Sequence, residues 1–438
     1  MALNKNAQLE QKWNMWSVSM VMLLAVWLVL SSHPVGVLAA QVQNSSEEKT
    51  LLKASSVISP DLLKSDLYTV DEEIVNDGLL NHYTVRSQFG VFRANSTPNL
   101  KQLLYEIQAI AAMKKIETKN TAAESVVQSG KNTVHGIANL VTDPRKTLEG
   151  AAAGVGSLFN RASQVVGKRK TTDAEDNKLE QFIGKSKSKG EIATRYGVSV
   201  YSLNPVLQQE LERLGWADYL GGIGVGLAQT AVPGSGGLLL TTSGTARLLN
   251  EVINNTPASE LWVQNKNKLE AMKIDSDTVQ LYLNNPSFSP ALQTIMVEAL
   301  ESMNGVENRG LFIKVSLQAN THEMADTITK ITTMIAGYHK NVEPLQSLAP
   351  YARFLYAKTE KGAAVVVFPA DHVLWSGRVA DVATWLSEPV QGEALPAGLQ
   401  MWILGDFSGK AKAELQSLGW ELHPNAQGKL MPDKKQKS

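Results

Sequence analysis

The chain has 438 residues, 43% of them hydrophobic, and is long enough for two or three domains with buried cores. Lys and Arg together number 42, as do Asp and Glu, and this zero net charge argues against a nucleic-acid-binding protein, which relies on clustered cations. The absence of cysteine excludes disulfides, thiolate metal sites and cysteine nucleophiles.

Residues 1–40 have the pattern of a signal peptide. Lys5 and Lys12 precede an apolar run over 15–30, and the small residues at 37–40 fit a cleavage site. A retained anchor in the inner membrane is the alternative, because the apolar run is long for a signal peptide. In both cases we expect the rest of the chain to be exported. A large secreted eukaryotic protein without disulfides would be unusual, so the periplasm or outer envelope of a bacterium, or secretion from it, is the simpler account.

The residues that follow predict a linker, a strand hairpin and a helix. Residues 41–66 are polar and are interpreted as a loose linker. Residues 82–93 place β-forming side chains on both sides of Gln88-Phe89-Gly90, which predicts a hairpin. Thr97-Pro98 then begins a helix, because proline is favoured at the first helical position, and the helix is expected to end near Lys119.

Residues 145–170 predict an amphipathic helix with glycines spaced along it. Apolar side chains form one stripe, small uncharged residues form the opposite face, and seven Lys or Arg against two Asp or Glu give residues 131–170 a net charge of +5. These features are typical of a helix that lies in a membrane interface beside anionic lipid. An ordinary helix packed on its own domain is the alternative. The residues expected to contact a membrane surface or a protein partner are Leu148, Val155, Leu158, Phe159, Val165, Val166, Arg161, Lys168, Arg169 and Lys170.

The same region carries a local resemblance. HGIANLVTDP and EGAAAGVGSLF, within residues 131–167, are similar to the glycine-spaced segments of chorein-type bridge-like lipid-transfer proteins. The resemblance is confined to this segment, and the chain is too short for the long β-groove of such proteins. It implies contact with lipid and nothing about an activity.

Residues 219–246 are the longest uncharged run after the signal region. The run extends from Asp218 to Arg247, contains eight glycines and has Pro233-Gly234 at its middle. It predicts two short apolar helices joined by a tight turn, buried at the centre of a helical domain over 191–347. The alternatives are the insertion hairpin of a pore-forming toxin and a single membrane crossing.

The last part of the chain predicts a small α/β unit. A strand hairpin is expected over 353–369, a helix over 372–386 and a buried strand over 399–405. Ser408 is expected to cap the next helix, which Gly419 ends before a final short strand.

Together these patterns predict a mainly α fold. We expect the protein to fall in the all-α class, with β-structure confined to two small units. Its helical domain would surround the buried apolar hairpin, with a small N-terminal β-hairpin and helix unit and a C-terminal α/β unit. The expected divisions are 1–40 signal peptide or anchor, 41–66 linker, 67–120 β-hairpin and helix, 121–170 glycine-spaced segment, 171–190 charged linker, 191–347 helical domain, 351–424 α/β unit and 425–438 disordered tail.

No motif identifies catalytic residues. GDFSG at 405–409 lies between a strand and a helix, but it lacks the glycine that a serine-hydrolase elbow places two before Ser408. His322-Glu323 begins like a zinc-binding HExxH helix, but the fifth residue is Asp326. Asp371-His372 follows a strand, where active sites of α/β layers often lie, and an exposed surface histidine is the simpler account. Catalytic residues are therefore unknown, and we expect no cofactor and no bound metal.

Four stretches resemble an uncharacterised family of exported bacterial proteins with no assigned activity. They are LVTDPRKTLEG, YGVSVYSLNPVLQQELERLGWA, PSFSPALQTIMVEALESM and LGDFSGKAKAELQSLGW. We expect a non-enzymatic envelope protein that contacts a membrane surface or a protein partner and binds no nucleic acid. An exported hydrolase, with its site between the helical and α/β units, is the first alternative, and a pore-forming or membrane-inserting toxin is the second. The oligomeric state is left open.

Overall fold

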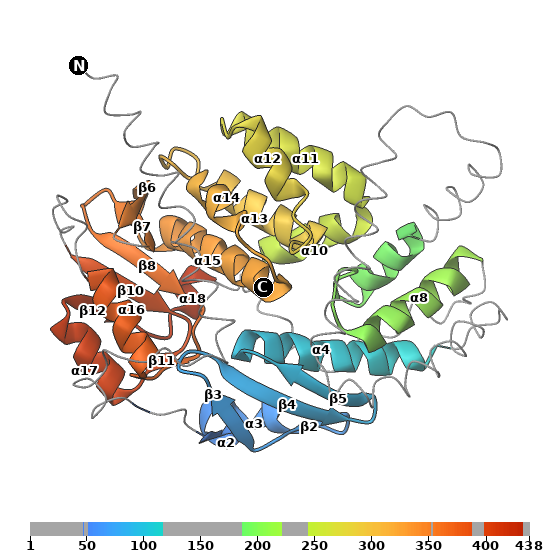
Figure 1. The fold of residues 1–438 in the computed structure, drawn as a ribbon. Helices are drawn as coiled ribbons and strands as arrows, with labels where there is room; N and C mark the ends of the chain where they lie inside the picture. Colours follow the sequence, from blue (N-terminus) through green and yellow to red (C-terminus); the bar gives the residue numbers. More distant parts are fainter. Residues whose placement is uncertain are drawn as a thin grey trace, which may run out of the picture. The chain divides into compact units, whose positions relative to one another are not determined.

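The computed structural model describes residues 47, 51–116, 186–220, 244–351, 354–387 and 398–431 (Figure 1). These residues fall into two compact units. The N-terminal unit consists mainly of Lys49–Asn265 with Ser289–Ile295, and the C-terminal unit of Lys266–Phe288 and Met296–Leu430 together with Glu47. Each unit contains one five-stranded sheet and several helices.

The sheet of the N-terminal unit is antiparallel and is built around β4. This strand pairs with β2 and β3, which follow each other along the chain, and with β5 across the turn at Gly90. Gly90 has φ +134°, a conformation that only glycine adopts without strain. The elements are β1 (Leu51–Lys53), α2 (Ala54–Val57), α3 (Pro60–Leu63), β2 (Tyr68–Val70), β3 (Glu73–Asn76), β4 (Asn81–Ser87) and β5 (Gly90–Ala94).

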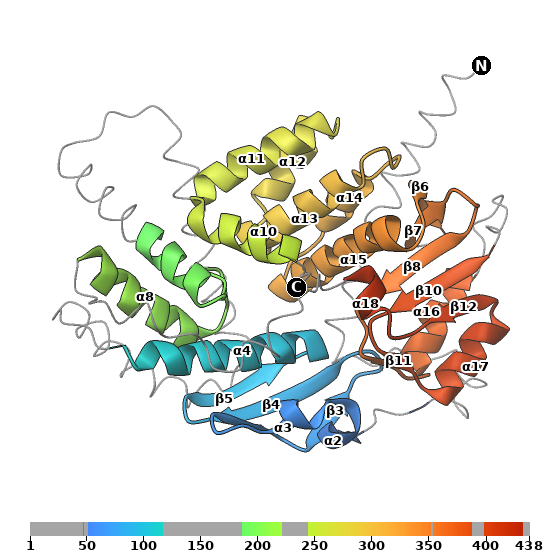
Figure 2. The ribbon, with the colours of Figure 1, turned by 180° about the vertical axis from the view of Figure 1, so that it is seen from behind.

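Helix α4 (Thr97–Lys114) is the buried centre of this unit. Its start is fixed locally, because the side chain of Ser96 accepts the N–H of Asn99 at 3.2 Å and Pro98 stands in the first turn. Every residue over 103–113 is buried. One face of α4 packs on the sheet, and the other packs on α8 (Pro205–Tyr219) and on the helix over 186–195 (Figure 2).

Helix α10 (Gly244–Asn255) fastens the turn that precedes α8. The amide of Asn254 donates to Val198 O at 2.8 Å and accepts the N–H of Val200 at 3.1 Å. Gly190 allows a close approach here, because a Cβ at this position would stand 2.1 Å from the carbonyl oxygen of Asn254. Helix α11 (Ala258–Ala271) follows along the chain.

The helices of the C-terminal unit begin with the second half of α11. Lys268 on α11 pairs with Glu298 and with Glu301, both on α13. The remaining helices of this part are α12 (Ser276–Leu283), α13 (Pro290–Ser302), α14 (Leu311–Ser316) and α15 (His322–Asn341).

The sheet of the C-terminal unit has the strand order β12-β10-β8-β7-β6, in which β8, β10 and β12 are parallel. Parallel strands in this order are joined by right-handed crossovers, so α16 and α17 share one face of the sheet. Helix α15 packs on the opposite face, where the hydroxyl of Tyr338 donates to Gln400 Oε1 at 3.2 Å (Figure 1). The elements are β6 (Leu345–Tyr351), β7 (Phe354–Thr359), β8 (Ala364–Phe368), β9 (His372–Val373), α16 (Gly377–Ser387), β10 (Leu399–Ile403), β11 (Asp406–Phe407), α17 (Gly409–Ser417), β12 (Trp420–His423) and α18 (Gln427–Leu430).

The prediction of a mainly α, all-α protein is wrong. Helix accounts for 53% and strand for 20% of the described chain, and both units contain a full sheet. Strands β2 and β3 have only three and four residues, and in β3 the exposed positions include Val75 and the buried ones Asn76. Such short strands carry too little periodicity to be recognised. Strand β1 and helices α2 and α3 lie where a polar linker was expected, held by the buried side chains of Ala54, Ile58 and Leu62.

Several local predictions are confirmed. The expected hairpin over 82–93 is β4–β5, Thr97-Pro98 begins α4, and the later strand at 399–405 is β10. The helix predicted from His372 starts at Gly377 instead, because His372 and Val373 pair with β11 as a short strand. Strands β9 and β11 form a separate two-stranded sheet at the point where a helix was expected.

Candidate functional site

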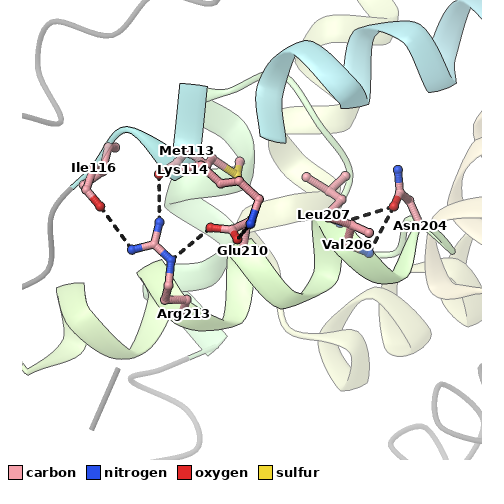
Figure 3. Close-up of polar contacts among 8 residues, drawn as sticks. All are labelled: Met113, Lys114, Ile116, Asn204, Val206, Leu207, Glu210 and Arg213. Carbon is pink, nitrogen blue, oxygen red and sulfur yellow. Dashed lines mark hydrogen bonds and ion pairs between the residues drawn. The ribbon is translucent and has the colours of Figure 1, made fainter. Parts of the chain in front are cut away.

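A polar seam lies between α4 and α8, within an otherwise apolar interface. It begins at Asn204, the residue that caps α8 (Figure 3). The side-chain oxygen of Asn204 accepts the N–H groups of Val206 and Leu207 at 3.1 and 3.3 Å. Its amide nitrogen donates to Glu106 Oε2 on α4 at 3.1 Å. One side chain therefore both starts α8 and ties it to α4.

Glu106 is the buried carboxylate of the seam. Its Oε1 accepts hydrogen bonds from Ser202 Oγ at 2.8 Å and from Gln102 Nε2 at 3.1 Å. Burial raises the pKa of Glu106, and the hydrogen bonds from Ser202, Gln102 and Asn204 offset part of this rise. With three donors on its two oxygens, this carboxylate holds the loop before α8 in place.

The raised pKa of Glu106 predicts a pH-dependent stability. Below its ordinary pKa of 4.5 the group is protonated in both the folded and the unfolded chain, and its contribution to stability is fully present. As pH rises, the unfolded chain ionises first, so the contribution is lost up to the higher folded-state pKa. We expect the unfolding free energy of the wild type, relative to Glu106→Gln, to fall as pH rises from 4.5, measured by urea titration. A difference that is constant with pH would contradict this.

Arg213, Glu210 and Lys114 form the other end of the seam, and we call these three residues the α4–α8 clamp. Arg213 Nε donates to Glu210 Oε2 at 2.9 Å, and Lys114 Nζ donates to Glu210 Oε1 at 2.8 Å. The two terminal nitrogens of Arg213 donate to the carbonyl oxygens of Met113 at 2.8 Å and Ile116 at 3.1 Å (Figure 3). The guanidinium thus caps the carboxyl end of α4, where unpaired carbonyls and the helix dipole favour a cation.

The seam fixes the direction of the two helices. Residues 202–204 contact the middle of α4 and Arg213 contacts its end, so α4 and α8 run in the same direction. Lys189, near the start of the helix over 186–195, pairs with Gln208 and Glu212 of α8. Ile116, which precedes the segment 117–185, and Lys189, which follows it, are therefore both bound to α8.

The clamp is an anchor rather than a reactive site. Glu210 and Arg213 are both buried, at 4% and 8% exposure, and each oxygen and nitrogen described above already has a partner. No sequence motif marks these residues as a site. The signal was available locally, because Glu210 and Arg213 stand three apart among the apolar positions of one helix, but their partners on α4 lie about a hundred residues away along the chain.

The residues predicted to contact a membrane or partner lie outside the described residues. This holds for Leu148, Val155, Leu158, Phe159 and Arg161, for Val165, Val166 and 168–170, and for residues 221–243 of the predicted apolar hairpin. Ser408 is confirmed as a helix cap, since its hydroxyl oxygen accepts the N–H of Ala411 at 3.0 Å.

The described residues contain no metal-binding cluster and no membrane-spanning helix. Within these ranges, no group of three or more His, Asp or Glu side chains is placed to hold a metal ion, and Asp326 pairs with Lys330 at 2.7 Å. In the part of the chain that the structure describes, no helix has the length and hydropathy to cross a bilayer.

Comparison with known proteins gives no match: no family model, no curated protein and no solved structure is similar to this chain. The two resemblances drawn from the sequence therefore remain predictions.

Proposed function

We propose that this protein is a non-enzymatic binding protein of the bacterial envelope that docks on an anionic membrane surface through residues 145–170. The observation that carries the proposal is that residues on both sides of the segment 117–185 are bound to α8. The α4–α8 clamp holds Ile116 through Arg213, and Glu212 pairs with Lys189. An insertion whose flanking residues are both bound to one helix begins and ends at a fixed place on the unit. A loose linker would not require the buried ion pair between Arg213 and Glu210 next to the residue where it begins.

The composition of the insertion supports membrane contact. Between 145 and 170 the apolar stripe is flanked by Arg145, Lys146 and Arg161 and by the run 168–170. Each cation near an anionic surface contributes about 1 kcal/mol of attraction. Glycines at 150, 154, 156 and 167 each cost about 1 kcal/mol relative to alanine in a helix, so such a helix needs a partner surface in order to form. The N-terminal signal pattern supports export.

Vesicle co-flotation tests the proposal. The chain from Gln41 onward would be mixed with phosphatidylcholine vesicles, with or without phosphatidylglycerol. We expect flotation only with the anionic lipid and a loss of about tenfold in Leu158→Asp/Phe159→Asp, because two charges would enter the apolar face. Added salt should also weaken flotation, since it screens surface charges.

A matched control distinguishes an effect on the apolar face from an effect of the added negative charge. Ser157→Asp/Ser163→Asp adds the same two charges on the predicted small-residue face and should retain most of the flotation. Absence of flotation in the unsubstituted chain would overturn the membrane proposal and leave a protein partner as the remaining account of the segment. Equal loss in both double variants would mean that net charge, and not an apolar face, governs binding.

A further inference from the structure

A carboxylate from the N-terminal part of the chain is bound within the C-terminal unit. Glu47 Oε2 accepts the backbone N–H of Trp375 at 2.6 Å and the hydroxyl of Ser408 at 2.6 Å. The backbone N–H of Glu47 donates to the carbonyl oxygen of Trp375 at 2.7 Å. One residue therefore engages both backbone groups of Trp375, one through its main chain and the other through its carboxylate.

The bound carboxylate lies at the carboxyl ends of the parallel strands. Trp375 follows β8 and β9, and Ser408 follows β10 and β11. The two strand extensions are held together, since Ser408 N donates to Val373 O at 2.8 Å. In α/β sheets with parallel strands, ligands bind outside this edge. The position of Glu47 therefore coincides with the position where such a sheet takes a ligand.

The two helices that begin here supply the chemistry for a carboxylate. Ser376 caps α16 by accepting the N–H of Val379 at 3.3 Å, and Ser408 caps α17. The first turns of both helices, which the structure describes in full, contain no acidic residue, although acidic side chains are favoured there. Ser408 accepts from Ala411 with its oxygen, so its proton is directed to the carboxylate. Asp371 and Asp406 belong to the same edge, so the placed donors rather than net positive charge make the site.

We propose that this edge is a recognition site for a peptide segment carrying a glutamate, and that Glu47 occupies it in cis as the competing ligand. The donors are the N–H of Trp375 and the hydroxyl of Ser408, and the carbonyl of Trp375 accepts the ligand's main-chain N–H. The ligand's main-chain N–H and its carboxylate both engage Trp375, so the site recognises a residue within a peptide. The carboxylate gives the specificity, because its two hydrogen bonds are charge-assisted.

Binding of a free peptide tests this site. The probe is a fluorescent, end-blocked peptide with the sequence of residues 43–51, and the readout is anisotropy with the chain from Gln41 onward. A tethered ligand competes at an effective concentration of about millimolar, so Glu47→Gln in the protein should strengthen peptide binding about tenfold. A peptide with glutamine in place of Glu47 should bind about tenfold more weakly, and one with glutamine in place of Glu48 should bind unchanged.

Two further protein variants keep the result interpretable if folding is affected. In the Glu47→Gln background, Ser408→Asp keeps a helix cap, as Asp275 does for α12 in the same unit, but replaces the hydroxyl donor with a repelling charge. It should abolish peptide binding. Thr321→Asp, at the cap of α15, adds the same charge elsewhere and should retain binding. Peptide binding no stronger in Glu47→Gln than in the unsubstituted chain, or equal binding of the glutamine peptide, would overturn the proposal.

Discussion

Replacing Arg213 with methionine is expected to lower the unfolding free energy of the N-terminal unit by about 3 kcal/mol. Glu210, which is 4% exposed, would keep only the partly exposed Lys114 as its partner. The carbonyl groups of Met113 and Ile116 would lose the donors that now cap α4. Native-state hydrogen exchange in α4 and α8 is the suitable measurement, because it reports on this unit separately from the other.

Two variants identify the cause of the loss. Arg195→Met removes an exposed arginine from the helix over 186–195 and should change exchange in α4 by less than about 0.5 kcal/mol. Glu210→Met/Arg213→Met removes the buried charge together with its partner and should recover at least half of the loss, because the uncompensated carboxylate is gone. If the loss of unfolding free energy in Glu210→Met/Arg213→Met equalled the sum of the losses in Glu210→Met and Arg213→Met, packing, and not the ion pair, would be what Arg213 supplies.

The parts of the fold that the sequence predicted correctly are those set by neighbouring residues. Helix α4 begins where serine and proline stand together, and α17 begins at the serine whose oxygen reaches Ala411. The hairpin β4–β5 turns at a glycine with positive φ. In each of these cases, the residue that fixes the boundary lies within three positions of it.

The interactions that define the two candidate sites are set by residues far apart in the chain. Arg213 meets Ile116 across 97 positions, and Glu47 meets Ser408 across 361. No periodicity or cap pattern reports such a pair. The same reason explains the misplaced start of α16, since His372 and Val373 pair with β11 and Trp375 binds Glu47. The amphipathic pattern of 145–170 is local. The sequence alone therefore identifies the apolar residues that mutation can test.

Gly337→Ala is expected to destabilise the C-terminal unit by about 3 kcal/mol, although alanine is the better helix former by about 1 kcal/mol. Gly337 lies within α15, where a Cβ would stand 1.7 Å from the carbonyl oxygen and 2.6 Å from the carbonyl carbon of Leu430, at the end of α18. These are backbone atoms, so no side-chain rotation can make room. The neighbouring contact from Asn341 to Lys429 O, at 3.1 Å, would be lost as α18 moved away.

The matched control for this prediction is Gly428→Ala, on α18 itself, where a Cβ would meet nothing within 4 Å. That variant should be neutral or slightly stabilising, because it gains helix propensity without a clash. Hydrogen exchange in α15 measures both variants, and only Gly337→Ala should accelerate it. If Gly337→Ala were as stable as the wild type, α15 and α18 would have to lie farther apart than the structure places them. The close approach of these two helices, which only a glycine allows, would then be wrong.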